Sequence, residues 1–224
     1  MAAGDVTISL LDELGVRLED PKERKYTEKV KIQALNSAIL HACIELTNGY
    51  LGELEVVDTS TPMTAFALPL SALASGTPFT GSEGVIMVQN GSTGGRFMTR
   101  MKLEDLKKLE NSILASGTTN LIYYVYAGSI NCKNGGTPTD PIVVYYLKNP
   151  ATVAIGTDPD INTALLDIVV DLAESLLFAA DDDQGRADDA LSSAMLQIDF
   201  LNAMYIPPFG IGTEGDKRYR NQTA

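Results

Sequence analysis

Two pairs of helix-forming segments enclose a stretch of chain with the composition of strands, and this layout limits the possible folds more than any other feature. Apolar residues recur at spacings of three and four over four segments, at about 5–19, 27–46, 161–180 and 186–205. Runs of β-branched and aromatic residues lie between them, at 54–57, 85–88, 121–126 and 142–147. We therefore expect an α+β fold whose helices and strands form separate parts.

Each helical segment carries an apolar stripe that we expect to be buried. In the first segment the stripe is Leu10, Leu11, Leu14 and Leu18. In the second it is Val30, Leu35, Ala38, Ile39, Ala42, Cys43 and Leu46. The third has Leu165, Ile168, Val169, Leu172, Leu176 and Ala179, and the fourth has Ala187, Ala190, Leu191, Ala194, Ile198 and Leu201. Asp5 or Thr7 is expected to cap the first helix.

The order of these segments predicts four parts of the chain. Residues 1–48 form a first helix pair, and 49–157 form a strand-rich insertion with one short helix at about 103–114. Residues 158–205 form a second helix pair, which the short 181–185 turn makes an antiparallel hairpin. Residues 206–224 form an extended arm. We expect the two helix pairs to pack as one four-helix bundle, because each helix has an apolar face to cover.

The arm keeps apolar residues although two prolines stop the preceding helix. A solubilising tail would carry few such residues, so we interpret the arm as a segment that docks on another subunit; a frayed terminus is the alternative. The residues expected to dock are Ile206, Pro207, Pro208, Phe209, Ile211, Lys217, Arg218, Tyr219 and Arg220.

The charge balance excludes some partners. The net charge of −12 argues against a protein that coats DNA, which would present a basic face. The longest apolar runs fall short of the roughly 18 residues that cross a membrane, and the N-terminus lacks the pattern of a signal peptide. Cys43 and Cys132 are far apart in sequence, which predicts neither a disulfide framework nor a zinc site.

The acidity is concentrated in the second helix pair. Between Asp158 and Asp189 there are ten acidic residues and one basic residue, Arg186. We expect an acidic surface made of Asp167, Asp171, Glu174, Asp181, Asp182 and Asp183. The three consecutive aspartates could also bind a divalent cation, but their spacing does not match the alternating ligands of a calcium loop, so a solvated turn is preferred.

Catalytic and cofactor sites are not expected. A nucleophile activated by histidine would have to use His41, which is expected to be an exposed surface residue without a paired nucleophile. The glycine-rich stretch 91–95 lacks the Gly-Lys-Ser/Thr ending of a phosphate loop. Of each tyrosine pair, Tyr123–Tyr124 and Tyr145–Tyr146, one ring should be in the core and one on the surface.

The order of several weak motifs resembles a known family. They are Val6-Thr7-Ile8-Ser9-Leu10-Leu11, Leu18-Glu19-Asp20-Pro21, Tyr26-Thr27, Ala34-Leu35-Asn36-Ser37-Ala38, Tyr123-Tyr124-Val125, the run Ile142 to Ala151, and Asp158-Pro159-Asp160. Together with the final helical hairpin, they resemble the head-to-tail adaptor (connector) proteins of tailed bacteriophages, with short-tailed phages favoured. The resemblance covers most of the chain outside 59–100.

This resemblance implies a structural virion protein and not an enzyme. Such adaptors form a ring, usually of twelve copies, at the portal vertex of the virion. The C-terminal arm embraces the portal, the strand-rich part faces tail, nozzle or spike proteins, and genomic DNA passes through the channel without specific binding. The acidic surface would then line the channel or the outside of the ring. The alternative is a small bacterial interaction or regulatory module whose acidic helices contact a partner.

Overall fold

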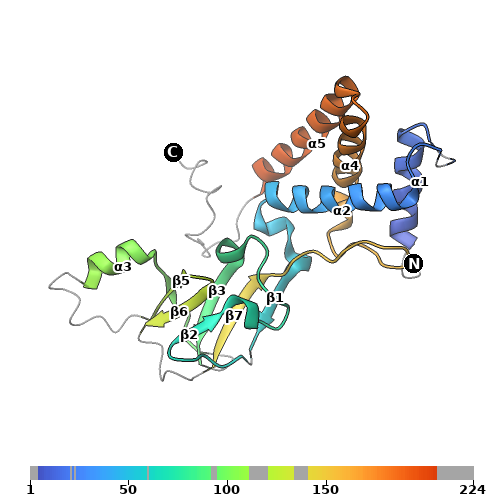
Figure 1. The fold of residues 1–224 in the computed structure, drawn as a ribbon. Coiled ribbons are helices and arrows are strands. Elements are labelled where there is room, and N and C mark those ends of the chain that lie inside the picture. Colours follow the sequence, from blue (N-terminus) through green and yellow to red (C-terminus); the bar gives the residue numbers. More distant parts are fainter. Residues whose placement is uncertain are drawn as a thin grey trace. The chain divides into compact units, whose positions relative to one another are not determined.

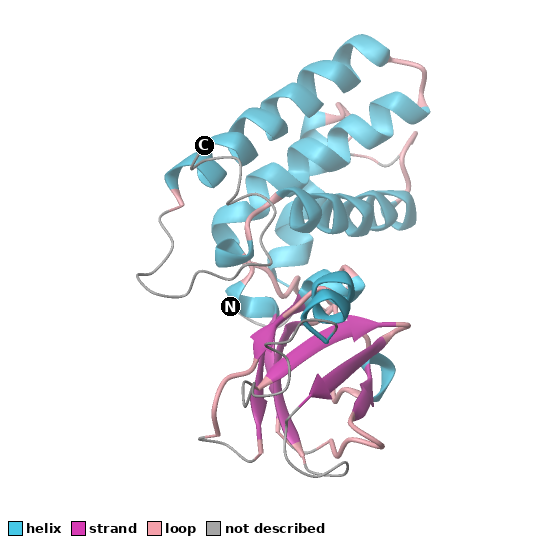
Figure 2. Cartoon of the chain, turned by 90° about the vertical axis from the view of Figure 1, so that its left-hand side faces the viewer, coloured by secondary structure: helices cyan, strands magenta, loops and turns pink. Residues whose placement is uncertain are grey.

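The described part of the chain forms two compact units (Figure 1). The structure, a computed structural model, describes residues 5–20, 22, 24–59, 61–91, 95–110, 121–133 and 141–205. One unit takes the described residues up to Leu54 and from Pro150 onward, and the other takes those within Glu55–Asn149. We call them the helical unit and the strand unit. All the strands in Figure 2 belong to the strand unit. The fold is therefore α+β, as the sequence predicts.

The helices begin and end within a few residues of their predicted positions. The helical unit contains α1 (Asp5–Arg17), α2 (Glu28–Glu45), α4 (Leu166–Ala180) and α5 (Gln184–Met204). The strand unit contains α3 (Leu103–Glu110), whose predicted continuation to Leu114 lies outside the described residues. Short 3-10 turns lie at Asn48–Tyr50, Gly52–Leu54, Leu70–Ala72, Gly81–Gly84 and Thr163–Leu165.

Helix α4 is the centre of the helical unit, because it packs against α1, α2 and α5. Its sequence accounts for this position: most residues between Ile168 and Phe178 are apolar or small, and they are buried around nearly the whole helix. The sequence predicted a single buried stripe that included Leu176 and Ala179. Both are exposed instead, while Val170 and Ala173 are buried.

Two connections hold the start of the helical unit together. The Asp158 carboxylate accepts hydrogen bonds from the backbone nitrogens of Val6 (3.0 Å) and Thr7 (3.1 Å), so it caps α1 from across the chain. Thr7, one of the two predicted cap residues, lies within α1, and its hydroxyl donates to the Thr157 carbonyl at 2.7 Å. The Asn36 side chain bonds both backbone groups of Val153, at 2.7 and 3.1 Å. Because Asp158 caps α1, the acidic spacer at 158–160 has a structural role.

The C-terminal ends of α2 and α5 are also joined. The Asn202 carboxamide accepts from the Thr47 backbone nitrogen at 2.8 Å and donates to the Glu45 carbonyl at 2.9 Å. The Tyr50 hydroxyl donates to the Leu201 carbonyl at 2.9 Å. The bond to the Glu45 carbonyl occupies a backbone acceptor that the end of α2 leaves without a helical partner. Together these bonds fix α5 in place over its last turn.

The strand unit consists of two small sheets. The first has the order β1-β7-β3, all antiparallel, with β1 (Glu55–Asp58), β3 (Val85–Asn90) and β7 (Ile142–Leu147). The second has the order β2-β6-β5-β4, with β2 (Ala67–Pro69), β4 (Thr99–Arg100), β5 (Ile122–Tyr126) and β6 (Ser129–Lys133). Strands β2, β4 and β6 were not predicted. They are short or polar, and pairing with β5 or with one another defines them.

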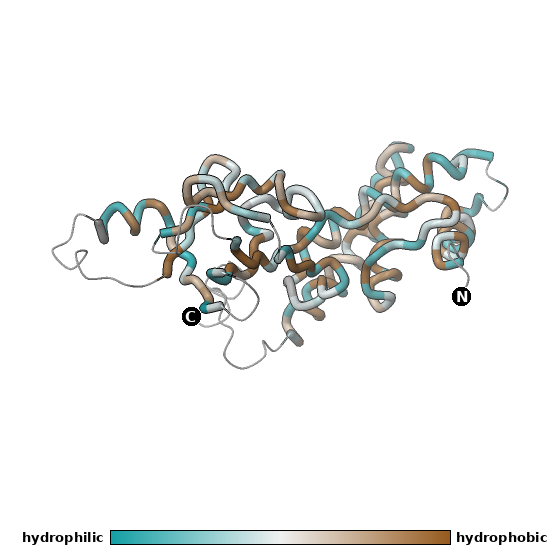
Figure 3. Tube along the Cα trace, turned by 90° about the horizontal axis from the view of Figure 1, so that it is seen from below, coloured by the Kyte–Doolittle hydropathy of each residue, from teal (hydrophilic) through white to brown (hydrophobic). Residues whose placement is uncertain are grey.

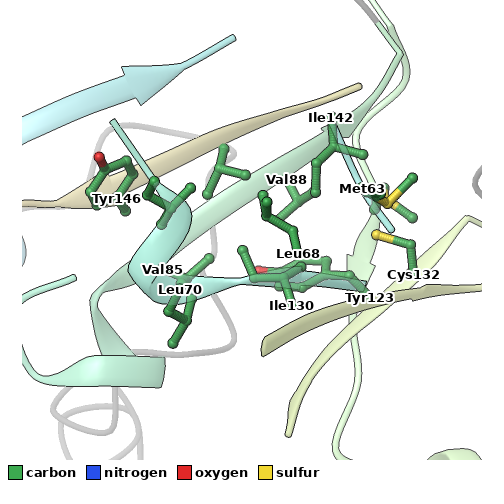
Figure 4. Packing of buried hydrophobic residues seen from close by; sticks show 13 residues of the cluster. Met63, Leu68, Leu70, Val85, Val88, Tyr123, Ile130, Cys132, Ile142 and Tyr146 are labelled. Atoms are coloured by element: carbon green, nitrogen blue, oxygen red, sulfur yellow. The ribbon is translucent and has the colours of Figure 1, made fainter. Parts of the chain in front are cut away.

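Both sheets contribute to one apolar core (Figure 4). Tyr123 of β5 and Tyr146 of β7 are fully buried in it, and the Ser75 backbone nitrogen donates to the Tyr146 hydroxyl at 2.8 Å. Tyr124 and Tyr145 are partly exposed, so the predicted alternation of each tyrosine pair is confirmed. Met63, Leu68, Val88, Ile130 and Ile142 fill the space around the two buried rings.

Helix α3 is amphipathic, and its residues alternate between hydrophilic and hydrophobic colours at the left of Figure 3. Leu106 is its buried residue near the middle of the helix. Among the helices of the described residues, none combines the length and the hydropathy that a membrane span requires.

Candidate interaction surfaces

Asp171 does not belong to the predicted acidic surface, because it is buried inside the helical unit. Its carboxylate forms a salt bridge with Arg17 of α1 and accepts hydrogen bonds from Ser193 Oγ and Gln197 Nε2 of α5, both at 2.8 Å. Its exposed fraction is 6%. A buried carboxylate needs such partners, since an unpaired charge in an apolar interior is costly. Asp171 therefore links α1, α4 and α5, which corrects the predicted exposed position.

Glu174 shares the same cation. Arg17 lies 3.7 Å from the Glu174 carboxylate and 2.6 Å from that of Glu13. Burial raises the pKa of Glu174, and the Arg17 charge offsets this rise in part. One guanidinium thus serves three carboxylates. Glu174 contributes to this partly buried cluster more than to an open acidic face.

Of the remaining predicted acids, Asp167 lies in the first turn of α4, and the other three lie at the turn between α4 and α5. Asp167, Asp182 and Asp183 are exposed. Asp181 is half-buried and pairs with Lys25 at 2.5 Å. Asp183 is the N-cap residue of α5 and accepts from the Arg186 backbone nitrogen at 3.4 Å. The acidic surface therefore persists at the hairpin turn, where the exposed Asp188 and Asp189 extend it along α5.

Arg186 anchors this turn to α1. Its guanidinium lies over the Phe178 ring, 4.0 Å from the centroid, and 3.7 Å from the Glu19 carboxylate. It also donates to the Arg17 carbonyl at 3.4 Å. The one base of the acidic segment is thus used within the helical unit.

Two free cysteines, Cys43 and Cys132, are buried in the described part of the chain. No group of three or more His, Cys, Asp or Glu residues in that part of the chain could hold a metal ion. Burial raises the pKa of the Cys43 thiol to about 12, with a smaller contribution from Asp160, and burial raises that of Cys132 to about 12. Both thiols therefore stay protonated at neutral pH. His41 is partly buried and not exposed as predicted.

The strand unit contains one open hollow of about 500 Å³ beside the turn between β5 and β6. Tyr126, Leu70 and Thr77 are among the residues that line it, and none of its described lining residues is charged.

Helix α5 leaves a large apolar face uncovered. Its buried residues are Ala187, Ala194 and Ile198. On the opposite side, Leu196, Phe200 and Met204 follow one another at intervals of four residues and are 71%, 63% and 59% exposed. The predicted stripe contained Leu191 and Leu201, of which Leu191 is exposed and Leu201 partly buried. We call Leu196, Phe200 and Met204 the α5 face.

Helix α2 has a second uncovered apolar face. Ala38 and Ala42 are buried on its inner side, while Val30, Leu40 and Ile44 are 38%, 44% and 47% exposed on the opposite side. Val30 was predicted to belong to the buried stripe and does not. We call Val30, Leu40 and Ile44 the α2 face. The spacing of four residues between Leu196, Phe200 and Met204, and between Leu40 and Ile44, was visible in the sequence as a second apolar stripe on each helix.

The predicted docking arm lies outside the described residues. This applies to Ile206, Pro207, Pro208, Phe209, Ile211, Lys217, Arg218, Tyr219 and Arg220. In sequence, the arm follows directly on Tyr205, whose ring packs against that of Tyr50 with centroids 5.7 Å apart. The last described residue before the arm is thus held to the helical unit.

No protein-family model matches the chain, and no curated protein matches it in sequence.

Proposed function

We propose that this chain is a structural connector of a tailed bacteriophage, a head-to-tail adaptor that assembles into a ring at the portal vertex. The observation that carries the proposal is the pair of uncovered apolar faces on α2 and α5. Single exposed apolar residues are ordinary on protein surfaces, but aligned sets on two helices of one unit are typical of a chain that is covered by other subunits. The order of motifs that resembles the adaptor family supports the same conclusion.

In this proposal the four helices of the helical unit form one bundle, and the bundles of neighbouring copies lie side by side around a channel. Helix α4 supplies the rigid centre, because it packs against the other three helices and is buried nearly all round. The proposed ring usually has twelve copies. The strand unit would face tail, nozzle or spike proteins.

The exposed acids of α4 and of the α4–α5 turn have a role in such a ring. Asp167, Asp182 and Asp183 are exposed in each copy. Cyclic repetition multiplies their field, and a surface of this sign repels DNA phosphates. We propose that they keep the genome from adhering as it passes. Asp171 and Glu174 contribute little to that field, because Arg17 neutralises part of their charge.

The arm is proposed to hold the ring on the portal. Binding of its apolar residues, Ile206, Phe209 and Ile211, would offset the free energy that is lost when an extended segment becomes ordered. Its bases would pair with acids on the portal. Binding assays with the portal protein test the function as a whole. Assembly of this chain on the portal supports the adaptor proposal. The absence of detectable binding at micromolar concentration contradicts it.

A small interaction module is the second candidate, and the exposed acidic turn favours it. Such a module would bind a basic partner through Asp182, Asp183, Asp188 and Asp189 without forming a ring. The two candidates differ in their response to salt and to portal. Binding of a module through these acids weakens steeply as salt is added, whereas ring assembly through apolar faces does not.

A further inference from the structure

The α5 face and the α2 face match each other along their helices. Leu40 and Ile44 follow Lys29 by 11 and 15 residues, and Phe200 and Met204 follow Asp189 by the same 11 and 15 residues. At 1.5 Å per residue, both sets span about 16 Å and about 22 Å from the charged residue. Two helices laid parallel would therefore bring Leu40 to Phe200 and Ile44 to Met204 at once.

The charges at the beginning of the two faces have opposite sign. Lys29 is exposed near the start of α2, and Asp189 is exposed on α5 on the same side as Leu196 and Phe200. In the parallel register that pairs the apolar residues, Lys29 lies next to Asp189. An antiparallel register would instead place Asp189 beside the apolar end of α2. Charge therefore selects the parallel arrangement.

The residues between these contacts also complement each other in size. Leu196, the most exposed residue of the α5 face, lies seven residues after Asp189, and Ser37 lies eight residues after Lys29. The small, exposed Ser37 leaves room for the Leu196 side chain, in the manner of a knob that enters a hole between larger residues.

Both faces belong to the same helical unit, but they lie on different helices. Each of these helices packs with its other side against α4. A contact between the α5 face of one copy and the α2 face of the next leaves one free face of each kind at the ends of the pair. Such a contact is head-to-tail, and it generates a ring where the rotation between neighbours closes and an open filament where it does not.

We infer that the α5 face of one copy binds the α2 face of a second copy of this chain, with Asp189 beside Lys29 and with Phe200 and Met204 on Leu40 and Ile44. This contact deepens the ring proposed above and rests on that proposal for the closure of the assembly. Both faces are therefore proposed to bind a second copy of the chain. The alternatives are that the arm of the same copy, or an unrelated protein, covers them.

Complementary single variants test the contact in the full chain. Phe200→Asp removes the α5 face and Leu40→Asp removes the α2 face, so each variant alone should sediment as a monomer. Mixed in equal amounts, they retain one intact face of each kind, and the mixture should form a heterodimer and nothing larger. An α5 face that paired with another α5 face would instead let Leu40→Asp form a homodimer, and that result overturns the inference.

A charge exchange tests the register. Lys29→Glu and Asp189→Lys should each raise the dissociation constant of self-association about five-fold, and the double variant Lys29→Glu/Asp189→Lys should restore it to within about two-fold. Asp167→Lys changes an exposed acid of α4 by the same charge and is the matched control. Additive weakening in the double variant contradicts the pairing. Because all three positions are exposed, circular dichroism should show unchanged folding.

The wild-type chain separates this inference from the proposed function. Sedimentation up to about 1 mM detects contacts of very low affinity. A wild-type chain that stays monomeric over this range, yet binds the portal, overturns the contact and leaves the adaptor function standing. A chain that self-associates as described but does not bind the portal supports the contact and contradicts the adaptor function.

Discussion

Asp171 of α4 is bound by Arg17 of α1, and the carboxylate of this ion pair is buried inside the helical unit. Ser193 and Gln197 of α5 donate to the other oxygen of the same carboxylate. One side chain therefore connects three helices. Its removal would take one acceptor from Arg17, which keeps Glu13 and Glu174, and would take the shared acceptor from Ser193 and Gln197.

Asp171→Ala should accordingly lower the free energy of unfolding by about 2 kcal/mol, because the variant loses the ion pair with Arg17 and the hydrogen bonds from Ser193 and Gln197. Urea denaturation of the purified chain measures this change. Asp167→Ala removes an exposed acid of the same helix and should stay within about 0.5 kcal/mol of wild type. Equal effects of the two substitutions would show that Asp171 does not have the structural role assigned to it.

Glu174 should make stability depend on pH. Burial raises its pKa in the folded protein, so its contribution is fully present below the pKa of the unfolded chain and is lost as the pH rises through the folded value. Glu174→Gln, which cannot ionise, should therefore gain stability relative to wild type as the pH rises. Urea unfolding of both proteins at acidic and at neutral pH tests this, and a gain that shrinks towards neutral pH would contradict it.

Asn202 should hold the C-terminal ends of α2 and α5 together. Asn202→Ala removes the acceptor for the Thr47 nitrogen and the donor to the Glu45 carbonyl, and we expect a loss of about 1–2 kcal/mol. Ser192→Ala, at an exposed position of the same helix, should be neutral or slightly stabilising. Faster hydrogen exchange in the last turn of α5 should accompany the loss in Asn202→Ala alone.

Stability and assembly should be separable on α5. Ile198→Ala creates a cavity under the helix and should cost about 3 kcal/mol, whereas Phe200→Ala, two residues away and exposed, should cost less than about 0.5 kcal/mol. Self-association should show the opposite order, with Phe200→Ala weakening it about tenfold. Calorimetry and sedimentation of the two variants provide both measurements. A Phe200→Ala protein that unfolds as easily as Ile198→Ala would mean that Phe200 is part of the core.

The main elements of this fold could be predicted from sequence because their signals are local. The four outer helices have sustained periodicity, and Leu10, Leu11, Leu14 and Leu18 are all buried as their spacing predicts. Strand β7 is a continuous β-branched and aromatic run, and it is the central strand of its sheet. Strand β6 was missed because Ser129, Asn131 and Lys133 lack strand preference, and its pairing with β5 lies in the tertiary structure.

The acidic surface was predicted less well, because helical periodicity shows which side a residue is on but not what packs there. Asp171 falls on the polar side of α4 by spacing, yet α1 and α5 cover that side. The covering helices bring Arg17, Ser193 and Gln197, none of which is near Asp171 in sequence. The exposed apolar residues Leu196 and Phe200 were not predicted either. Helices α2 and α5 each have two apolar stripes, and periodicity alone does not show which of them is buried.

The arm offers a direct test of portal attachment. A chain truncated after Tyr205 should still fold, because it keeps the buried residues of the helical unit from Leu10 to Ile198. It should bind the portal at least about 100-fold more weakly than the full chain, because the proposed apolar anchors are gone. Full-strength binding by the truncated chain would assign the attachment to the folded part.

The central claim is that copies of this chain assemble on a portal. The most direct measurement is negative-stain electron microscopy of the full chain mixed with the portal protein of the same phage, with native mass spectrometry to count the copies. The proposed function predicts a ring of this chain on one end of each portal, with several copies in cyclic symmetry. Bare portals beside unbound monomers, at concentrations where both proteins are folded, would contradict it.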